Sequence, residues 1–149
     1  PAGISVLGDD VEVQANSCVD RATLGETRIG NDVKIDDLAL VGHGSTVGEG
    51  TVLCAQVGLA GTTEVGKGCM LGGQVGASGH LKIGDGAMIT PQSGVPNDVP
   101  PGVLYSGSPV VEHKQWLRNS AAINHLADLL KTVRRLESEV ESLKARSIT

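Results

Sequence analysis

The strongest constraint in this sequence is a six-residue period that runs from residue 29 to residue 95. Eleven of the twelve residues at that spacing are Val, Ile or Leu, the full set being Ile29, Ile35, Val41, Val47, Leu53, Leu59, Val65, Leu71, Ala77, Ile83, Ile89 and Val95. An α-helix requires apolar spacings of three and four, and a half-buried strand requires simple alternation, so neither explains this period. The period fits a coil of three short, flat strands that turns a corner about every six residues.

The residues around each periodic position support this coil. Glycine often follows it, as at Gly30, Gly42, Gly48, Gly66, Gly72 and Gly84. A small or apolar residue often stands two places before it, as at Val33, Ala39, Val57, Cys69, Val75 and Ala87. One aliphatic side chain per face is expected to point inward and stack on its equivalent in the next coil, about 4.8 Å away. Because no coil buries its apolar side alone, the coils must stack.

The period changes phase near the start of the chain and fades near its end. Leu7, Val13 and Val19 carry it in another phase, which predicts a small insertion near residues 21–27. Four prolines, Pro96, Pro100, Pro101 and Pro109, are expected to cap the far end of the stack. Because the chain begins at Pro1 in mid-pattern, we interpret it as part of a longer protein.

Composition agrees with a thin, layered core and narrows the function. The chain has one Trp, one Tyr, no Phe and 21 Gly among 149 residues. A net charge of -5 argues against nucleic-acid binding. No apolar run is long enough to span a membrane. Three cysteines without metal-ligand spacing (Cys18, Cys54 and Cys69) favour a reduced, cytoplasmic setting, and we interpret them as small core residues.

Residues 111–149 form a second region with a different pattern. A helix is predicted from about Val111 to Arg146, and its apolar residues follow spacings of three and four at Leu126, Leu129, Val133, Leu136, Val140 and Leu143. This is the a/d seam of a coiled coil. The helix could pack on its own chain or join subunits, and the narrow stripe favours the second. Trp116 is expected to anchor the start of the helix on residues 1–110.

Several segments together resemble the family of UDP-3-O-acylglucosamine N-acyltransferases, over nearly the whole chain. The hexad alone is shared by many transferases. The more specific segments are Ala15–Arg21, Lys34–Leu38, Val41–His43, Ala55–Gly61, Gly72–Gly76, Gly79–His80, Pro101–Pro109 and Trp116–Arg118.

The resemblance implies a left-handed β-helix that forms a homotrimer, with active sites in grooves between subunits. It implies transfer of a 3-hydroxyacyl group from acyl carrier protein to the 2-amine of UDP-3-O-acylglucosamine in lipid A synthesis, with no cofactor. In that family's pattern His43 is the catalytic base, Asp36 orients it, the Gly61 N–H holds the oxyanion, and His80 lies near the donor. The family's uridine-binding domain has no counterpart here, and Asp37 and Gly44 replace the usual Asn.

The spacing of these residues can be tested against an eighteen-residue coil. Gly61 follows His43 by eighteen residues, so it should lie directly above it, one strand spacing away. His80 follows by thirty-seven, two coils plus one residue. Asp36 precedes His43 by seven and belongs to the preceding face. A histidine suits the base because its ordinary pKa lies near neutrality.

Three other functions stay open. Another hexapeptide acyltransferase of the same pathway would transfer to a hydroxyl. A zinc enzyme would need several ligands within about 2.1 Å of one point, and His43 and His80 are too far apart in one chain. A trimeric β-helix without activity, or one that only binds the carrier protein, is the third. Basic residues of the tail could meet an acidic carrier or form the polar face of a coiled coil (Lys114, Arg118, Lys131, Arg134 and Arg135), whereas His113 and His125 are expected to be ordinary surface residues.

Overall fold

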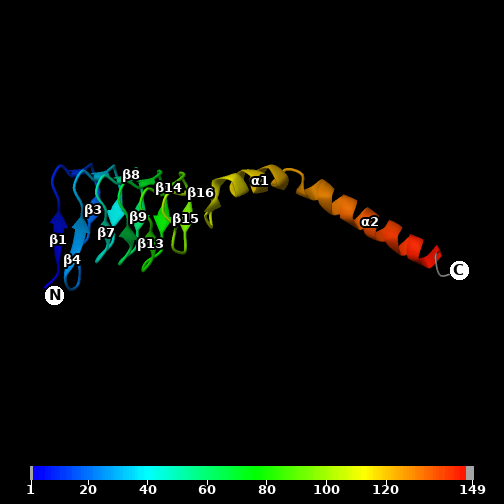
Figure 1. Ribbon diagram of the computed structural model, residues 1–149, viewed down its shortest axis with the longest axis horizontal. Coiled ribbons are helices and arrows are strands. Elements are labelled where there is room, and N and C mark those ends of the chain that lie inside the picture. The colour runs from blue at the N-terminus through cyan, green and yellow to red at the C-terminus, as the bar shows by residue number, and fades with distance from the viewer. Residues whose placement is uncertain (1, 147–149) are drawn as a thin grey trace. The chain divides into compact units, whose positions relative to one another are not determined.

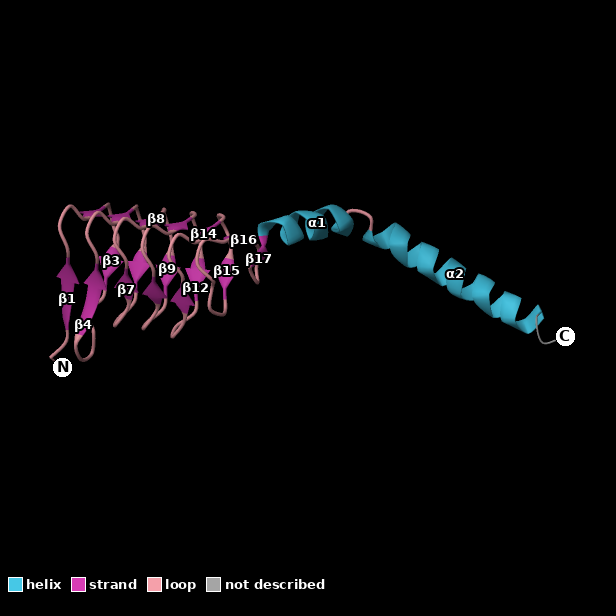
Figure 2. Cartoon of the chain, in the orientation of Figure 1, coloured by secondary structure: helices cyan, strands magenta, loops and turns pink. Residues whose placement is uncertain are grey.

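A computed structural model describes residues 2–146 of the chain. The chain divides into two compact units, residues 1–113 and residues 114–149. The first unit consists of coils of short strands stacked along one axis, with strands from successive coils lying side by side (Figure 1). Nearly all of these strands are two residues long and are joined by tight turns (Figure 2).

Three parallel sheets form the three faces of this unit, and the chain visits them in turn. Face A consists of β1 (Ile4–Leu7), β4 (Glu26–Ile29), β7 (Thr46–Val47), β10 (Glu64–Val65) and β13 (Lys82–Ile83). Face B consists of β2 (Glu12–Val13), β5 (Lys34–Ile35), β8 (Val52–Leu53), β11 (Met70–Leu71), β14 (Met88–Ile89), β16 (Leu104–Ser106) and β17 (Val111–Glu112). Face C consists of β3 (Cys18–Val19), β6 (Leu40–Val41), β9 (Gly58–Leu59), β12 (Gly76–Ala77) and β15 (Gly94–Val95).

The strand register confirms the eighteen-residue coil and the insertion. Val47 pairs with Val65, eighteen residues on, whereas Val19 pairs with Val41, twenty-two residues on. The first coil is therefore four residues longer, and the extra residues lie between β3 and β4. At the other end the offset falls to sixteen, because Ile89 pairs with Tyr105. The last strand, β17, runs antiparallel to β16 and covers its edge.

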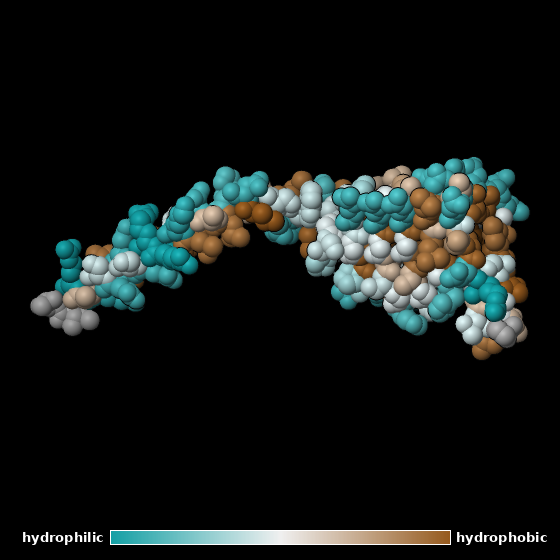
Figure 3. Space-filling model, turned by 180° about the vertical axis from the view of Figure 1, so that it is seen from behind, coloured by the Kyte–Doolittle hydropathy of each residue, from teal (hydrophilic) through white to brown (hydrophobic). Residues whose placement is uncertain are grey.

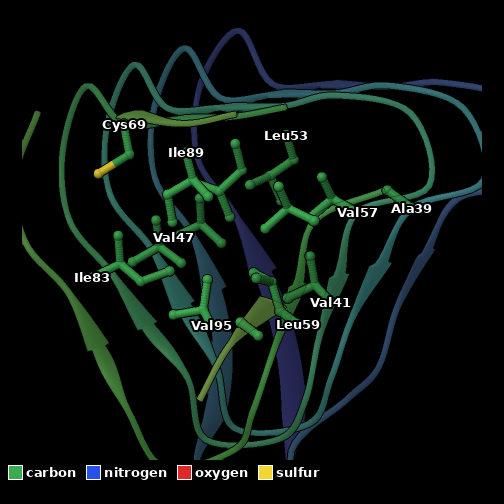
Figure 4. Close-up of a cluster of buried hydrophobic side chains, with 14 of the residues drawn as sticks. Ala39, Val41, Val47, Leu53, Val57, Leu59, Cys69, Ile83, Ile89 and Val95 are labelled. Carbon is green, nitrogen blue, oxygen red and sulfur yellow. The ribbon is translucent and has the colours of Figure 1, made fainter. Parts of the chain in front are cut away.

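The core is the predicted one. All twelve periodic residues are buried, and the most exposed of them, Ala77, is only 6% exposed. The side chains of the three faces point toward one another inside the coil, as the labelled residues of Figure 4 show. Full burial of each Val, Leu or Ile contributes about 1.5–3 kcal/mol, so the stack gives the corners a rigid support. The fold class is a left-handed parallel β-helix with a C-terminal helical extension, as predicted.

The outward side chains differ from face to face. Face A carries charged pairs, such as Lys82 with Glu64 at 3.0 Å. Face B carries an apolar row made of Val52, Met70, Met88 and Leu104, whose neighbours are paired in register. Face C carries a row of glycines at Gly58, Gly76 and Gly94. From residue 46 onward the three faces thus offer a charged, an apolar and a bare surface, whereas face B begins with the Lys34–Glu12 ion pair and face C with the exposed Leu40.

The helical region differs from the prediction in its start and in its continuity. Val111 and Glu112 form β17, and in place of one continuous helix the structure has α1 (His113–Ile123) and α2 (Leu126–Arg146), separated by a turn at Asn124 and His125. Asn is a weak helix former because its side chain competes for nearby backbone groups. No residue of either helix is buried, and apolar side chains are exposed along this region (Figure 3). Among the described residues, no helix is long and apolar enough to cross a membrane.

Candidate active site

His43 lies at the corner where the chain leaves face C and enters face A. β6 ends at Val41, and a turn over His43 and Gly44 leads to β7. Gly44 has φ of 67°, a left-handed conformation that glycine adopts without steric cost. Its N–H donates to Oγ1 of Thr27 at 2.8 Å. The turn is thereby held in place while the His43 side chain remains exposed.

Gly61 lies one coil above His43, as its spacing predicts. The N–H of Thr62 donates to the His43 carbonyl at 2.8 Å, which ties the two corners together. A β-carbon added to Gly61 would lie 2.5 Å from Nε2 and 2.7 Å from Cε1 of His43. The imidazole therefore occupies the space that any larger side chain at position 61 would need.

The residue above Gly61 offers no side-chain acceptor for the Gly61 N–H. At three equivalent corner positions, a side-chain oxygen from the following coil accepts the turn N–H, in the pairs Asp9 with Asn31 at 3.0 Å, Ala15 with Asp37 at 2.9 Å, and Lys67 with Asp85 at 2.8 Å. The residue above Gly61 is Gly79, which has no side chain. Among the described residues no acceptor is found for the Gly61 N–H, so this donor remains available to a ligand.

His80 belongs to the same corner as His43 and Gly61. Its N–H donates to the Gly61 carbonyl at 3.2 Å, and its side chain is exposed. His80 has φ of 60° and occupies the turn position that Gly44 and Thr62 occupy in the coils before it. Three of the four predicted site residues thus stand in one column along the edge between faces C and A.

Asp36 lies elsewhere in the single chain. It follows β5 at the corner between faces B and C, and its Oδ1 accepts the N–H of Asp37 at 2.8 Å. All of β6 separates Asp36 from His43, and extended chain covers about 3.3 Å per residue. A carboxylate–imidazole hydrogen bond requires about 2.8 Å. The predicted orienting contact is therefore not made within one chain.

A hollow of about 430 Å³ lies beside His43, and the insertion supplies its other walls. It is lined by Asp20, Arg21, Ala22, Thr23 and His43. Asp20 and Arg21 belong to a segment that resembles the transferase family, but the sequence alone predicts no role for either residue. The available signal was the break in the six-residue period, which displaces this segment from the regular coil.

A second hollow, of about 370 Å³, lies at the far end of the glycine row on face C. Gly76 and Gly94 line it, together with Ser108 and Pro109. No atom lies within 4 Å of an ideal β-carbon at Gly58 or Gly76, so the outer surface there is open backbone. The row is therefore a trough that begins in the coil of Gly61 and runs along the axis.

The cysteines and His113 agree with the sequence predictions only in part. Of the three cysteines interpreted as core residues, only Cys69 is buried, whereas Cys54 is half-buried and Cys18 is exposed. Burial raises the pKa of the Cys69 thiol, and its Sγ lies 3.2 Å from the Gly84 carbonyl. His113 is not an ordinary surface residue as expected, because its Nδ1 lies 2.7 Å from Oγ of the buried Ser106. Within residues 2–146 no group of three His, Cys, Asp or Glu side chains could hold a metal ion.

Comparison with known proteins gives the same family as the motifs. Residues 26–61 match the model of the bacterial transferase hexapeptide with six repeats. The chain is 60% identical over 138 residues to a UDP-3-O-acylglucosamine N-acyltransferase of Thermosynechococcus vestitus, and 58% identical over 142 residues to one of Myxococcus xanthus. These matches cover 93% and 95% of the chain but only 41% of each relative. The resemblance drawn from the motifs is confirmed.

Solved structures agree on the fold. The chain matches a UDP-N-acetylglucosamine O-acyltransferase of Moraxella catarrhalis with a TM-score of 0.72 and 30% identity, over 78% of the chain and 48% of that protein. A UDP-N-acetylglucosamine acyltransferase of Campylobacter jejuni matches with a TM-score of 0.71 and 26% identity, over 72% and 44%. These homologues are acyltransferases built on the same coil.

Proposed function

We propose that this chain is the acyl-transfer β-helix of a UDP-3-O-acylglucosamine N-acyltransferase, acting in lipid A synthesis. The donor is a 3-hydroxyacyl thioester of acyl carrier protein, and the acceptor is the 2-amine of UDP-3-O-acylglucosamine. The amine nitrogen attacks the thioester carbonyl, a C–N bond forms, and the C–S bond breaks. The amine loses one proton and the departing thiol gains one, so the reaction needs no cofactor.

The observation that carries this proposal is the contact of His43 with Gly61. Aminolysis requires a base for the amine proton and a donor for the developing oxyanion, held close together. The imidazole of His43 lies against Gly61, whose N–H has no acceptor among the described residues. A thioester carbonyl bound at this N–H would have its carbon beside the amine that His43 deprotonates. His80, in the same column, is positioned to contact the donor.

The glycine trough of face C is consistent with a donor that carries a long acyl chain. It is open along Gly58 and Gly76 and ends at the hollow of about 370 Å³ near Gly94. Successive coils are about 4.8 Å apart, so the three glycines extend over about 10 Å. An extended acyl chain lying in this trough would keep its thioester near Gly61 and its methyl end near Gly94.

A homotrimer would complete the site. Asp36 lies at one edge of face C and His43 at the other, so a threefold-related copy could bring its Asp36 to this chain's His43. The apolar row of face B and the exposed seam of α2 are surfaces suited to subunit contacts, whereas charged face A suits solvent. The helical residues Lys114 and Arg118 would attract the acidic carrier protein, which in a cytoplasmic enzyme is the co-substrate.

An O-acyltransferase is the second candidate, because the solved O-acyltransferase of Moraxella catarrhalis shares the coil at 30% identity. The two are separated by supplying the 3-hydroxyacyl carrier protein with either an amine acceptor, UDP-3-O-acylglucosamine, or a hydroxyl acceptor, UDP-N-acetylglucosamine. We expect amide formation only. His43→Ala should lower turnover about a thousandfold, the share of a general base, and His125→Ala should not. Ester formation instead would establish the second candidate, and unchanged turnover in His43→Ala would reject the base.

Mixing two inactive variants tests the shared site. A trimer that combines His43→Ala chains with Asp36→Ala chains contains some interfaces where an intact His43 meets an intact Asp36. Random assortment restores about a quarter of the sites if the two residues come from different copies. No recovery on mixing would place both residues in one chain, whereas normal turnover by the Asp36→Ala chain alone would show that Asp36 has no part in the reaction.

A further inference from the structure

Arg21 differs from every other basic residue of residues 2–111. Four of the five basic side chains in that range form ion pairs with glutamates, namely Arg28 with Glu26, Lys34 with Glu12, Lys67 with Glu49, and Lys82 with Glu64. For Arg21 no ion pair is found among the described residues, and the only hydrogen bond recorded for its guanidinium is a long one of 3.5 Å to the Ala22 carbonyl. Its charge is available to a ligand.

The backbone on both sides of Arg21 is fixed. The N–H of Asp20 donates to the Val41 carbonyl at 2.9 Å, and the N–H of Ala22 donates to the Ile4 carbonyl at 3.3 Å. Ala22 is 1% exposed, so it anchors this segment in the core. Arg21 consequently projects from a held position, in the same column as His43, because Val19 and Val41 are partners two residues earlier.

Asp20 and Arg21 place opposite charges in the hollow that contains His43. Both side chains are exposed and line this hollow of about 430 Å³. As with Arg21, no ion pair is found for Asp20 among the described residues. A ligand that satisfies both must carry an anionic group and a hydrogen-bond-donating group close together. The acceptor has this chemistry, because its amine and its diphosphate are on adjacent carbons of the sugar.

We propose that Asp20 and Arg21 form the acceptor subsite and position the nucleophile for His43. This inference rests on the proposed function and deepens it. The guanidinium of Arg21 binds the sugar-linked phosphate through charge-assisted hydrogen bonds. The carboxylate of Asp20 accepts a hydrogen bond from the amine and holds its nitrogen beside Nε2 of His43. In this proposal the role of the segment with the four-residue insertion is to bind the acceptor.

Binding to the intact chain tests the subsite without requiring turnover. Glucosamine 1-phosphate carries both groups, glucosamine lacks the phosphate, and N-acetylglucosamine 1-phosphate lacks the free amine. Dissociation constants are measured by NMR titration for the wild type, Arg21→Gln, Asp20→Asn and the control Arg28→Gln, which removes a charge from face A. Phosphopantetheine serves as a fourth ligand, because the carrier protein's arm also contains a phosphate.

We expect the wild type to bind glucosamine 1-phosphate more tightly than either single-group sugar. Arg21→Gln should weaken binding of both sugar phosphates about tenfold or more and leave glucosamine unaffected. Asp20→Asn should weaken the two amines and spare the N-acetyl sugar. Arg28→Gln should change nothing. The absence of wild-type binding, an equal effect of Arg21→Gln and Arg28→Gln, or loss of phosphopantetheine binding in place of sugar binding would overturn the proposal.

The outcome is separable from that of the proposed function. If the subsite binds as expected while His43→Ala transfers acyl groups normally, the catalytic assignment fails and the subsite stands. If His43 is essential and Arg21→Gln has no effect on sugar binding, the catalysis stands and the subsite fails. Arg21→Lys provides a check on folding, because it keeps the charge and should retain part of the phosphate affinity.

Discussion

The corner between faces A and B and the corner between faces C and A use the same backbone turn. They differ in the side chain that stands above the turn. Both corners pass through a left-handed residue in successive coils, for example Gly68 at the first and His80 at the second. At the first corner, Asp85 fills the position above Lys67 and accepts its N–H. At the second, Gly79 fills the position above Gly61 and accepts nothing. In these two turns the Lys67 N–H finds an acceptor within the chain, whereas among the described residues none is found for the Gly61 N–H beside His43.

This difference indicates that glycine at the second corner is there for space. A β-carbon at Gly61 would collide with His43, and one at Gly79 would lie 2.8 Å from the Gly61 carbonyl. An acid or amide at position 79 would accept the Gly61 N–H, which we propose holds the oxyanion. The repeat thus supplies identical turns, and the choice of side chain decides which turn becomes a site.

The largest expected effect comes from filling the space at Gly61. Gly61→Ala should lower kcat about a hundredfold, because the added methyl group forces the His43 ring from its place and a displacement near 1 Å has that cost. The matched control is Gly73→Ala, at the equivalent position of the B–C corner, where the nearest atom to a new β-carbon is 3.4 Å away. Equal activity in the two variants would show that the position of the His43 ring is unimportant.

A smaller effect is expected from obstructing the glycine trough. Gly76→Leu should lower kcat/KM about tenfold for a long acyl donor and leave a short donor unaffected, because the new side chain stands where the acyl chain lies. The fold should tolerate it, since no atom lies within 4 Å of the new β-carbon. Thr46→Leu, an outward position on face A, is the control. The trough is not an acyl site if both donors respond alike.

Removing the Asp85 acceptor at the corner between faces A and B should lower stability without changing activity. Asp85→Ala leaves the Lys67 N–H without its acceptor and should lower the free energy of unfolding by about 1 kcal/mol, measured by urea denaturation. Asp85→Asn retains an Oδ1 and should restore most of it, as Asn31 does for Asp9 in an earlier coil. Transfer activity should be unchanged in both. A loss of activity would mean that the two corners are coupled.

The periodic part of the molecule is predictable from its sequence, and the reason is geometric. In a repeat, an offset in residue number is an offset in space, so the position of Gly61 above His43 follows from counting. The same reasoning fails where the offset changes. The break in the period locates the four-residue insertion but does not say what Arg21 and its neighbours do there, and no periodic signal announces the coil that pairs Ile89 with Tyr105 at sixteen residues. The helix break at Asn124 depends on local helix propensity, and the a/d spacing of the apolar residues does not predict it.

The orienting role of Asp36 stays a prediction, for a different reason. Its separation from His43 is one hexad plus one residue, which spans face C of the coil. Residues that meet only across a subunit boundary leave no distance signal in one chain. A resemblance to a family can predict that two such residues act together, whereas their spacing in the sequence cannot.

The third corner, between faces B and C, should be the least sensitive to loss of its side-chain hydrogen bonds. Its left-handed positions hold a ladder in which Nε2 of Gln92 donates to Gln74 at 2.9 Å and Nε2 of Gln74 donates to Gln56 at 2.7 Å. These bonds are exposed and exchange readily with water. Gln74→Gly loses them but relieves a strained φ of 63°, so the free energy of unfolding should change by less than about 0.5 kcal/mol. Gln74→Val keeps the strain with a branched side chain and should cost about 1–2 kcal/mol. If the glycine variant proved as unstable as the valine variant, the ladder rather than the turn would hold this corner.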